Sequence, residues 1–87
     1  MLDAYTVYDK KARSYARPFF TDNDEVAIRM FLDAAKDEGS VFYLHPEDFV
    51  LYCIGHFDEQ SGLINGFEAI VHVSDLVNLM VCYSDVG

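Results

Sequence analysis

The apolar run FVLYCIGHF at residues 49–57 constrains the fold more than any other segment of the chain. Aromatic and aliphatic side chains dominate it, and turn-forming residues bound it on both sides, Pro46-Glu47-Asp48 before it and DEQSG (58–62) after it. A short apolar run between turn signals predicts a strand. The loop that follows predicts a hairpin in which Gly62 can adopt a positive φ.

Both faces of this strand are apolar, so both need cover. One helix can cover one face of a small sheet, and the other face then needs the C-terminal segment or a second subunit. We therefore expect a homo-oligomer, a dimer or larger. Strict alternation predicts two sets of side chains on opposite faces, Phe49, Leu51, Cys53 and Phe57 against Val50, Tyr52, Ile54 and His56.

The segment that follows residue 21 predicts one main helix. Asp22 as N-cap and Glu25 three residues later have the spacing of a capping box. No Gly or Pro interrupts Val26 to Asp37, and Gly39 follows as a natural stop. The apolar side of this helix would consist of Ala27, Ile28, Phe31, Leu32, Ala34 and Ala35.

The N-terminal third predicts strands. Leu2 to Tyr8 predicts a first strand, and Asp9 to Ser14 predicts a turn or exposed loop. Tyr15 to Phe20 is interrupted by Pro18, which cannot donate to a ladder, so it predicts an edge strand or an ordered extended segment.

The remaining segments leave more alternatives open. Ser40 to His45 predicts a short strand or an irregular connection, and Leu63 to Val73 predicts the second arm of the hairpin, bulged or broken at Gly66. Ser74 is placed to cap a short final helix over 75–80, and an extended C-terminal tail fits the sequence equally well.

These elements predict an α+β fold with a small antiparallel sheet and one main helix, approximately in the order β-β-α-β-β plus a C-terminal segment. A length of 87 residues allows a single domain, 1–87. An apolar fraction of 52% argues against disorder. No window approaches the ~20 apolar residues of a membrane span, and no signal peptide is evident. We expect a soluble cytoplasmic protein with no membrane partner.

The charge is distributed unevenly along the chain. The 6 basic and 15 acidic residues give a net charge of −9. Residues 1–21 carry a net +2, however, and residues 22–87 carry a net −11. Affinity for nucleic acid comes largely from Lys and Arg side chains that neutralise phosphates. The composition therefore restricts any nucleic-acid contact to the N-terminal segment.

That N-terminal segment, YTVYDKKARSYARPFF (5–20), interleaves four cations with aromatic residues. Single-stranded nucleic-acid binders combine cations that follow the phosphates with aromatic faces on which bases stack. The pattern favours such a surface. The alternative is that the aromatic residues are core and the cations belong to a solvated loop.

Catalytic and metal-binding motifs are absent from the sequence. His45, His56 and His72 show no HExxH spacing, and although the last two lie on opposite arms of the predicted hairpin, we expect two unrelated positions. Cys53 and Cys82 lie in apolar runs without CxxC spacing, which predicts buried free thiols. We expect no enzyme activity, no metal site and no cofactor.

Two stretches, in order, resemble the small nonstructural protein of gokushovirus-type microviruses, which are single-stranded DNA phages. TVYDKKARSYARPFF (6–20) resembles the N-terminal signature of that family. HPEDFVLYCIGHFDEQSGLI (45–64) resembles its second signature, in which HPED leads into an apolar strand and an FD-x-x-x-G hairpin. The amphipathic helix between them is also similar, whereas residues 67–87 match no pattern of the family.

The resemblance implies a DNA-binding phage protein that shifts genome replication toward single-stranded DNA synthesis for packaging. It implies single-stranded DNA as ligand, a phage or host replication protein as further partner, and the host bacterial cytoplasm as location, outside the mature virion. The motif positions that could contact DNA are Lys10, Lys11, Arg13, Tyr15 and Arg17, and the aromatic pattern adds Tyr8, Phe19 and Phe20. Preservation of the motif for folding is the alternative.

A second function class fits the acidic remainder of the chain. An acidic surface steers encounters with basic partners and can mimic DNA. The chain would then be a protein-interaction adaptor that engages a host or phage replication or assembly protein, and an assembly or scaffolding role is a third possibility.

Overall fold

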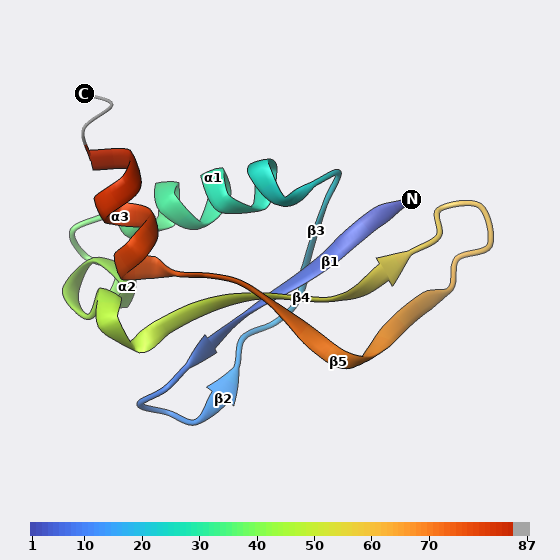
Figure 1. Cartoon of the computed structure of the whole chain (residues 1–87), viewed down its shortest axis with the longest axis horizontal. Coiled ribbons are helices and arrows are strands. Elements are labelled where there is room, and N and C mark those ends of the chain that lie inside the picture. The colour runs from blue at the N-terminus through green and yellow to red at the C-terminus, as the bar shows by residue number, and fades with distance from the viewer. Residues whose placement is uncertain (85–87) are drawn as a thin grey trace.

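A computed structural model of the chain describes residues 1–84. The architecture is the α+β fold that the sequence predicts, with an antiparallel sheet and one main helix. Among the described residues no helix is long and apolar enough to cross a membrane. The elements in chain order are β1 (Leu2–Asp9), β2 (Ser14–Tyr15), β3 (Phe19–Thr21), α1 (Asp24–Ala35), α2 (Val41–Leu44), the 3-10 helix η1 (Pro46–Asp48), β4 (Phe49–Phe57), β5 (Ile64–Asp75) and α3 (Leu76–Ser84) (Figure 1).

The strands form one sheet in the order β2-β1-β4-β5, and β3 also pairs with β1. All pairings are antiparallel. The predicted edge strand at 15–20 is therefore two short strands, one at each end of β1, with Tyr8 opposite Tyr15 and Tyr5 opposite Phe19. Pro18 lies in the break between them, where the sheet requires no hydrogen bond from the N–H group that proline lacks.

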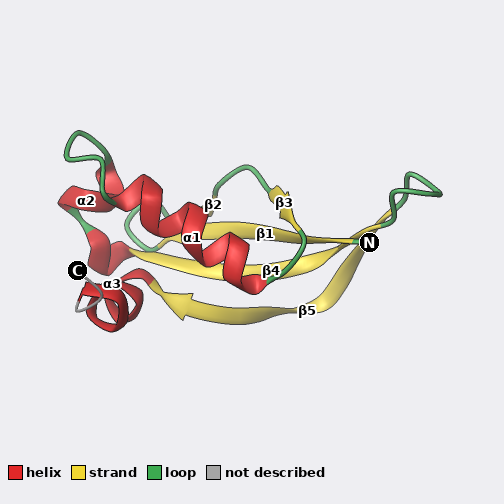
Figure 2. Cartoon of the chain, turned by 90° about the horizontal axis from the view of Figure 1, so that it is seen from above, coloured by secondary structure: helices red, strands yellow, loops and turns green. Residues whose placement is uncertain are grey.

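One face of the sheet is covered by helices, with α1 lying across β1 and β4 (Figure 2). The hydrophobic core lies between them, because a helix with one apolar side is stable only when that side is buried. Tyr5 and Leu51 are fully buried in the sheet. The core cluster consists of Tyr5, Val7, Ala27, Phe31, Ala35, Phe49, Leu51, Cys53, Leu76 and Leu79.

The N-cap of α1 is one residue later than predicted. Asn23, not Asp22, has the extended backbone of a cap, and its side-chain oxygen accepts a hydrogen bond from the Val26 N–H at 3.0 Å. The Asn23 carbonyl also accepts from the Ala27 N–H. Thr21 is buried and donates its hydroxyl to the Asn23 carbonyl. This bond fixes the chain just before the helix, so Asp22 precedes the cap and does not form it.

The segment 40–45 is helical, so the prediction of a strand or irregular connection is wrong. The Ser40 hydroxyl accepts from the Tyr43 N–H and caps the single turn of α2. Phe42 then inserts between Phe31 and Phe49, with ring centroids 5.6 and 4.6 Å away and edge-to-face geometry. Tertiary packing of one aromatic ring thus determines the local structure.

A bulge in β4 changes which side chains face the core. The register shifts so that Ala4 lies opposite Gly55 and Tyr5 lies opposite Cys53, which leaves Ile54 unmatched. The alternation therefore changes phase. Phe57 contacts Phe20 on the side away from α1, at 5.7 Å between centroids, and the His56 ring lies by Asp3. The predicted faces are correct for 49–53 and wrong for His56 and Phe57.

For the C-terminal part, the structure decides between the alternatives that the sequence left open, with a bulge in β5 and a final helix in place of an extended tail. β5 is bulged next to Gly66, as expected, and it runs directly into α3. Cys53 is buried, whereas Cys82 is exposed, so the prediction of two buried thiols is wrong for Cys82. Leu76 and Leu79 define the buried side of α3. Cys82 follows Leu79 by three residues and lies at the border of that side, so its thiol stays exposed.

Candidate nucleic-acid interface

The face of the sheet opposite α1 carries no helix among residues 1–84 (Figures 1 and 2). We call it the open face. Residues that alternate with the core positions point toward it, since neighbouring residues of a strand point to opposite sides. On β1 and β4 these include Thr6, Tyr8 and Tyr52, which alternate with the buried Tyr5, Val7 and Leu51.

Four rings form a continuous row across the open face. Tyr15 on β2 lies 4.7 Å from Tyr8 on β1 and 6.1 Å from Tyr52 on β4, measured between ring centroids. Tyr52 lies 5.8 Å from the His72 ring on β5. We call this row the ring strip. It brings together two residues predicted for the site, Tyr8 and Tyr15, and two that were not.

The outer end of the ring strip is held in place by a buried hydroxyl. Thr6 donates its side-chain hydroxyl to the Ala16 carbonyl at 2.7 Å, and the Ala16 N–H donates to the Val7 carbonyl at 2.8 Å. Thr6 is itself buried. These bonds fix β2 against β1, so Tyr15 keeps its place in the strip although it is 54% exposed.

A tight turn carrying three cations adjoins the strip at the β1–β2 connection. We call it the basic turn, and it spans 10–13. The Asp9 carboxylate accepts hydrogen bonds from the N–H groups of Lys11 and Ala12, and its carbonyl accepts from the Arg13 N–H. Arg13 closes the turn with φ 57°, in the left-handed region. All three basic side chains, Lys10, Lys11 and Arg13, are exposed.

The cations of the predicted site are available to a ligand. Within residues 1–84, Lys10, Lys11, Arg13 and Arg17 form no salt bridge. Asp9 is committed to the backbone of the turn. The basic turn thus carries three cations that no ion pair neutralises within residues 1–84, although the net charge of the chain is negative.

Phe19 and Phe20 are divided between the two faces. Phe19 packs against the core, with its ring centroid 5.8 Å from that of Tyr5. Phe20 lies on the open face by Phe57, away from the ring strip along the strands. Neither residue joins the basic turn, so the structure places Phe19 with the core and Phe20 at a separate aromatic pair.

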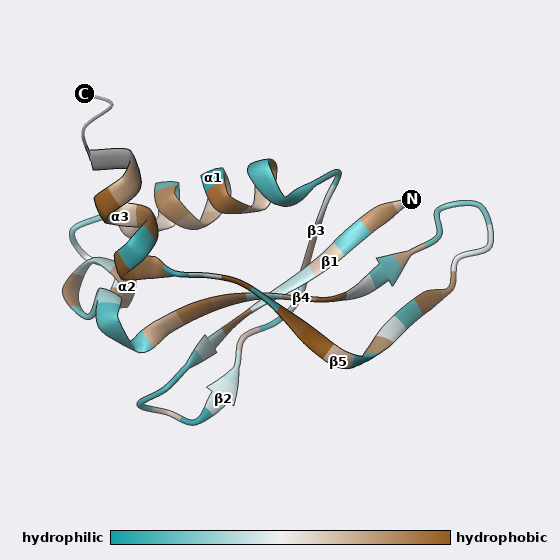
Figure 3. Cartoon of the chain, viewed as in Figure 1, coloured by the Kyte–Doolittle hydropathy of each residue, from teal (hydrophilic) through white to brown (hydrophobic). Residues whose placement is uncertain are grey.

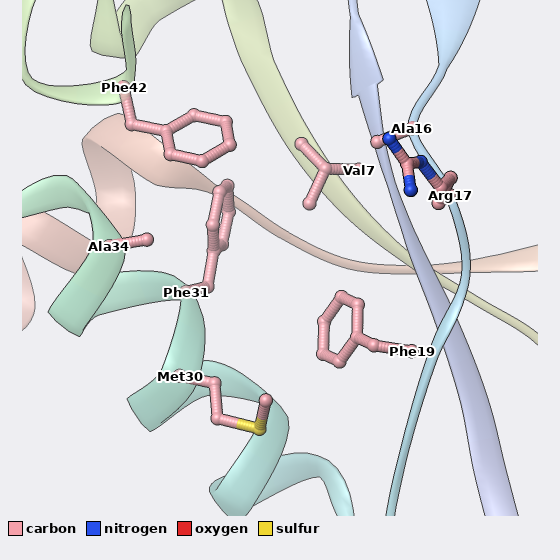
Figure 4. A pocket seen from close by; sticks show the side chains of 8 residues that line it. All are labelled: Val7, Ala16, Arg17, Phe19, Met30, Phe31, Ala34 and Phe42. Atoms are coloured by element: carbon pink, nitrogen blue, oxygen red, sulfur yellow. The ribbon is translucent and has the colours of Figure 1, made fainter. Parts of the chain in front are cut away.

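Arg17 lies on the other side of the sheet edge from Tyr15. It lines a cavity of about 250 Å³ between β2, β3 and α1, and it is the one charged residue of that lining (Figure 4). The other lining residues are Val7, Ala16, Phe19, Met30, Phe31, Ala34 and Phe42. Arg17 is therefore placed at the edge of the candidate interface and not within the ring strip.

A family comparison agrees with the resemblance seen in the sequence. A model of the family described as Phage ORF5 protein matches residues 2–79. The chain belongs to this family. One relative, Protein ORF5 of Chlamydia phage 1, is 45% identical over 62 residues, which cover 67% of this chain and 65% of the relative. The chain thus spans just under two-thirds of that relative's length. No solved structure matches.

Family membership establishes a small phage protein of the gokushovirus type. The matched range 2–79 contains the basic turn and every residue of the ring strip. The names of the family and of the relative state no ligand or activity.

Tyr52 and His72 were not predicted to lie at the site. The sequence placed Tyr52 on an apolar face and His72 at an unrelated strand position. The register brings them together, because His72 lies opposite Tyr52 and His56 lies opposite Asn65, so the two histidines do not meet. The available signal was alternation, since Tyr52 has the opposite parity to the buried Leu51 and Cys53.

A second polar cluster lies on the helix-covered face, near the start of α1. The Tyr5 hydroxyl donates to the Asp24 carboxylate and lies 3.3 Å from that of Asp3, which also contacts His56 Nδ1 at 2.9 Å. Burial, and then the hydrogen bond to Asp24, raise the pKa of the Tyr5 hydroxyl. These contacts connect β1, β4 and α1, and we assign them to stability.

His45, Glu47 and Asp48 could each offer a ligand atom to a cation, within 4.8 Å of one another. They lie around η1, which adjoins the basic turn through the Lys10 N–H donated to the Asp48 carbonyl at 2.8 Å, and turns commonly carry such acids. We assign no site to them.

Proposed function

We propose that this chain binds single-stranded DNA on its open face, with the bases on the ring strip and the phosphates at the basic turn. The observation that carries the proposal is the unbroken row of four rings beside a cationic turn. Aromatic faces stack on every base, so such a row binds single strands with little sequence preference. Bases in a duplex are already stacked and cannot use it.

The charge distribution limits the affinity and the mode of binding. Three or four cations neutralise few phosphates, and the acidic remainder of the chain repels other parts of the strand. The interaction is therefore of modest strength per chain and sensitive to salt. It requires no catalysis, and we propose a binding protein rather than an enzyme.

The biological role that we propose is the one that the resemblance implies. In the cytoplasm of the host bacterium, the chain would coat or mark single-stranded genome and so direct replication toward single-stranded DNA for packaging, with a phage or host replication protein as partner. Family membership supports a role in the phage cycle, and the open face supports the choice of ligand.

Removal of single rings tests the stacking surface. Fluorescence anisotropy of a labelled oligothymidylate at low salt should show that Tyr15→Ala and Tyr52→Ala each weaken binding by about 5–100-fold, as expected for about 1–3 kcal/mol per stacked base. Tyr43→Ala is the matched control, because Tyr43 is 44% exposed on α2, away from the open face. Equal affinities of Tyr15→Ala, Tyr43→Ala and the parent would overturn the proposal.

Removal of the cations tests the phosphate contacts separately. A Lys10/Lys11/Arg13 triple alanine variant should bind more weakly. Its plot of log K against log salt should be less steep, by about 0.7 for each phosphate that the turn no longer neutralises. The control is Arg29→Ala with Lys36→Ala, which removes two cations from α1 and its C-cap. A slope that is unchanged in the triple variant would show that the basic turn does not contact the backbone of DNA.

A further inference from the structure

β5 lies at the edge of the sheet although its composition is that of a central strand. Ala69 to Val73 (AIVHV) is apolar on both faces, which is typical of strands covered on both sides. Yet Ile70 is 37% and Val71 is 52% exposed. Figure 3 shows this hydrophobic stretch of β5, in brown, at the periphery of the molecule.

The outer edge of β5 also lacks the residues that usually protect an edge strand. Within residues 1–84, β5 pairs with β4 alone. Between Ile64 and Ser74 the sequence contains one formal charge, Glu68, and neither Lys nor Pro. Exposed edges are normally blunted by such residues, because unpaired backbone groups are a template for another strand.

The segment 67–70 is the part of this edge that is least committed to the rest of the sheet. The register of β4 and β5 passes from Gly55 opposite Gly66 to Cys53 opposite Val71, and residues 67–70 have no partner in β4. β5 bows away from β4 around this segment (Figure 1). The bow brings its backbone to the outside of the sheet.

Alternation fixes which side chains of this segment share a face. Phe67 packs against the core and contacts His56, whereas His72 lies on the open face by Tyr52. Between them, Glu68 and Ile70 therefore join His72 on the open face. Ala69 and Val71 point to the other side.

We propose that two copies of this chain associate through their β5 strands, antiparallel and centred on Ile70. In this register Glu68 lies opposite His72 of the partner subunit, Ile70 lies opposite its own copy, and Ala69 lies opposite the larger Val71. The acid meets an imidazole twice, and no like charges are directly opposed. The same imidazole also contacts the Asp75 carboxylate of its own strand, at 3.1 Å from Nε2 to Oδ1. Directly opposed residues in an antiparallel pair share a face and interact across the strands.

This self-complementarity is what selects a second copy over a different protein. A two-fold axis perpendicular to the sheet makes every cross-strand pair other than the central Ile70 pair occur twice, so one favourable pairing is used on both sides. The same axis keeps both open faces on one side of the assembly. The unpaired backbone edge of β5 is then covered, and Ile70, which a monomer leaves 37% exposed, gains an apolar cross-strand neighbour on its own face.

The pairing extends the proposed function, and this consequence rests on that function. The ring strip ends at His72, on the strand that forms the interface. The two strips therefore lie on the same face of one continuous sheet, offset along the strands by the 68-to-72 register, with a basic turn at each far end. Strands are about 4.8 Å apart, so about seven spacings place the two β2 strands about 34 Å from each other.

The oligomeric state of the full chain and of two matched variants tests the interface. Size-exclusion chromatography with light scattering should give the parent a mass of about twice 9.9 kDa. Ile70→Lys should be monomeric, because it places two like charges opposite each other. Ile64→Lys should remain dimeric, since Ile64 is 63% exposed on the same strand but lies outside the paired stretch.

A cross-link tests the register and does not depend on the charge variant folding well. With Cys82→Ser as background, Ile70→Cys should form a disulfide-linked dimer on mild oxidation, because directly opposed Cβ atoms lie close enough. Ile64→Cys should not. Circular dichroism establishes that each variant is folded. A monomeric parent, or a dimer that Ile70→Lys leaves intact, would overturn the proposal.

The outcomes separate this inference from the proposed function. A dimer that dissociates in Ile70→Lys, in a chain that does not bind oligothymidylate, would support the interface and reject the function. A monomer that binds oligothymidylate through Tyr15 would support the function and reject the interface.

Discussion

Arg13 combines a strained backbone with a predicted role in binding. Its φ of 57° lies in the left-handed region, where an L side chain is disfavoured by about 1–2 kcal/mol. The turn keeps this conformation because the Arg13 N–H donates to the Asp9 carbonyl, and the Asp9 carboxylate accepts from Lys11 and Ala12. Under the proposed function, this strained position supplies an exposed cation, so the strain and the charge can be tested separately.

Two substitutions at this position separate the strain from the charge. Arg13→Gly should be more stable than Arg13→Ala by about 1 kcal/mol, because only glycine adopts the left-handed region without a steric penalty. Both lose the cation and should weaken oligothymidylate binding equally. Urea unfolding and anisotropy measure the two effects, and unequal DNA affinities of the two variants would mean that turn geometry, not charge, governs binding.

Tyr5 predicts a loss of stability in alkali. Burial and the hydrogen bond to Asp24 raise the pKa of its hydroxyl in the folded chain. The folded state then holds a proton that the unfolded state releases above about pH 10, so the unfolding free energy is unaffected below that pH and falls as pH rises above it. Tyr5→Phe should remove this contribution. Urea unfolding between about pH 8 and pH 11 measures it.

Tyr5→Phe should also be less stable than the parent at neutral pH, by about 1–2 kcal/mol, because it leaves the Asp24 carboxylate without the hydroxyl that donates to it. Tyr43→Phe is the control, since Tyr43 is exposed. If the parent and Tyr5→Phe showed the same slope with pH, the Tyr5 hydroxyl would not be the group that titrates.

At the residue scale, the sequence predicted half of the ring strip. Tyr8 and Tyr15 lie within one hairpin, so their proximity follows from a short turn between them. Tyr52 and His72 come from β4 and β5, and their place depends on registers that no local pattern specifies. Phe19 is aromatic and near the cations in the sequence, but the packing of α1 draws it into the core.

At the scale of elements, the β4–β5 hairpin depends on a glycine that permits close approach. A Cβ at Gly55 would lie 2.3 Å from the Asn65 carbonyl oxygen and 3.0 Å from the Gly66 Cα. Both are backbone atoms, so no side-chain rotation can relieve the contact. Gly66, in contrast, has its nearest such atom, the Ile54 carbonyl oxygen, at 4.0 Å.

The two glycines therefore predict opposite tolerance to the same substitution. Gly55→Ala should lower the free energy of unfolding by about 1–3 kcal/mol, in the range of other overpacked sites, because the two strands must separate to admit the methyl group. Gly66→Ala should change it by less than about 1 kcal/mol. Thermal and urea unfolding give both values, and similar losses for the two variants would contradict the close approach at Gly55.

The same hairpin shows where prediction from sequence ends. Its strands, its loop and the irregularity near Gly66 follow from composition and turn signals. The phase change at Ile54 does not, because a bulge depends on the partner strand and reverses the faces of His56 and Phe57. The helical turn α2 was missed for a related reason, since Phe42 is held by contacts with Phe31 and Phe49 and not by local propensity.

At the scale of the whole molecule, the scarcity of basic residues and the exposed apolar edge of β5 are two difficulties that pairing of two chains would relieve together. A chain with a net charge of −9 and few basic residues binds a polyanion weakly as a monomer. Two copies joined at β5 would present two basic turns and two ring strips on the same face of one sheet. The exposed apolar edge of β5 and the weakness of binding would thus have a common physical solution, whereas the face of β4 that the sequence expected a second subunit to cover would stay open to the ligand.

This arrangement predicts that affinity depends on oligonucleotide length only when the chains are paired. An oligothymidylate of about 20 nucleotides can engage both strips, and the second contact is then intramolecular, which raises affinity by about 10²-fold or more. One of about 5 nucleotides reaches a single strip. Anisotropy should therefore show a large preference for the longer strand in the parent and in Ile64→Lys. Ile70→Lys adds the same charge but separates the subunits, so it should bind the short strand as Ile64→Lys does and lose most of the preference for the long one. Retention of the full length preference by monomeric Ile70→Lys would show that a single strip accommodates the whole strand.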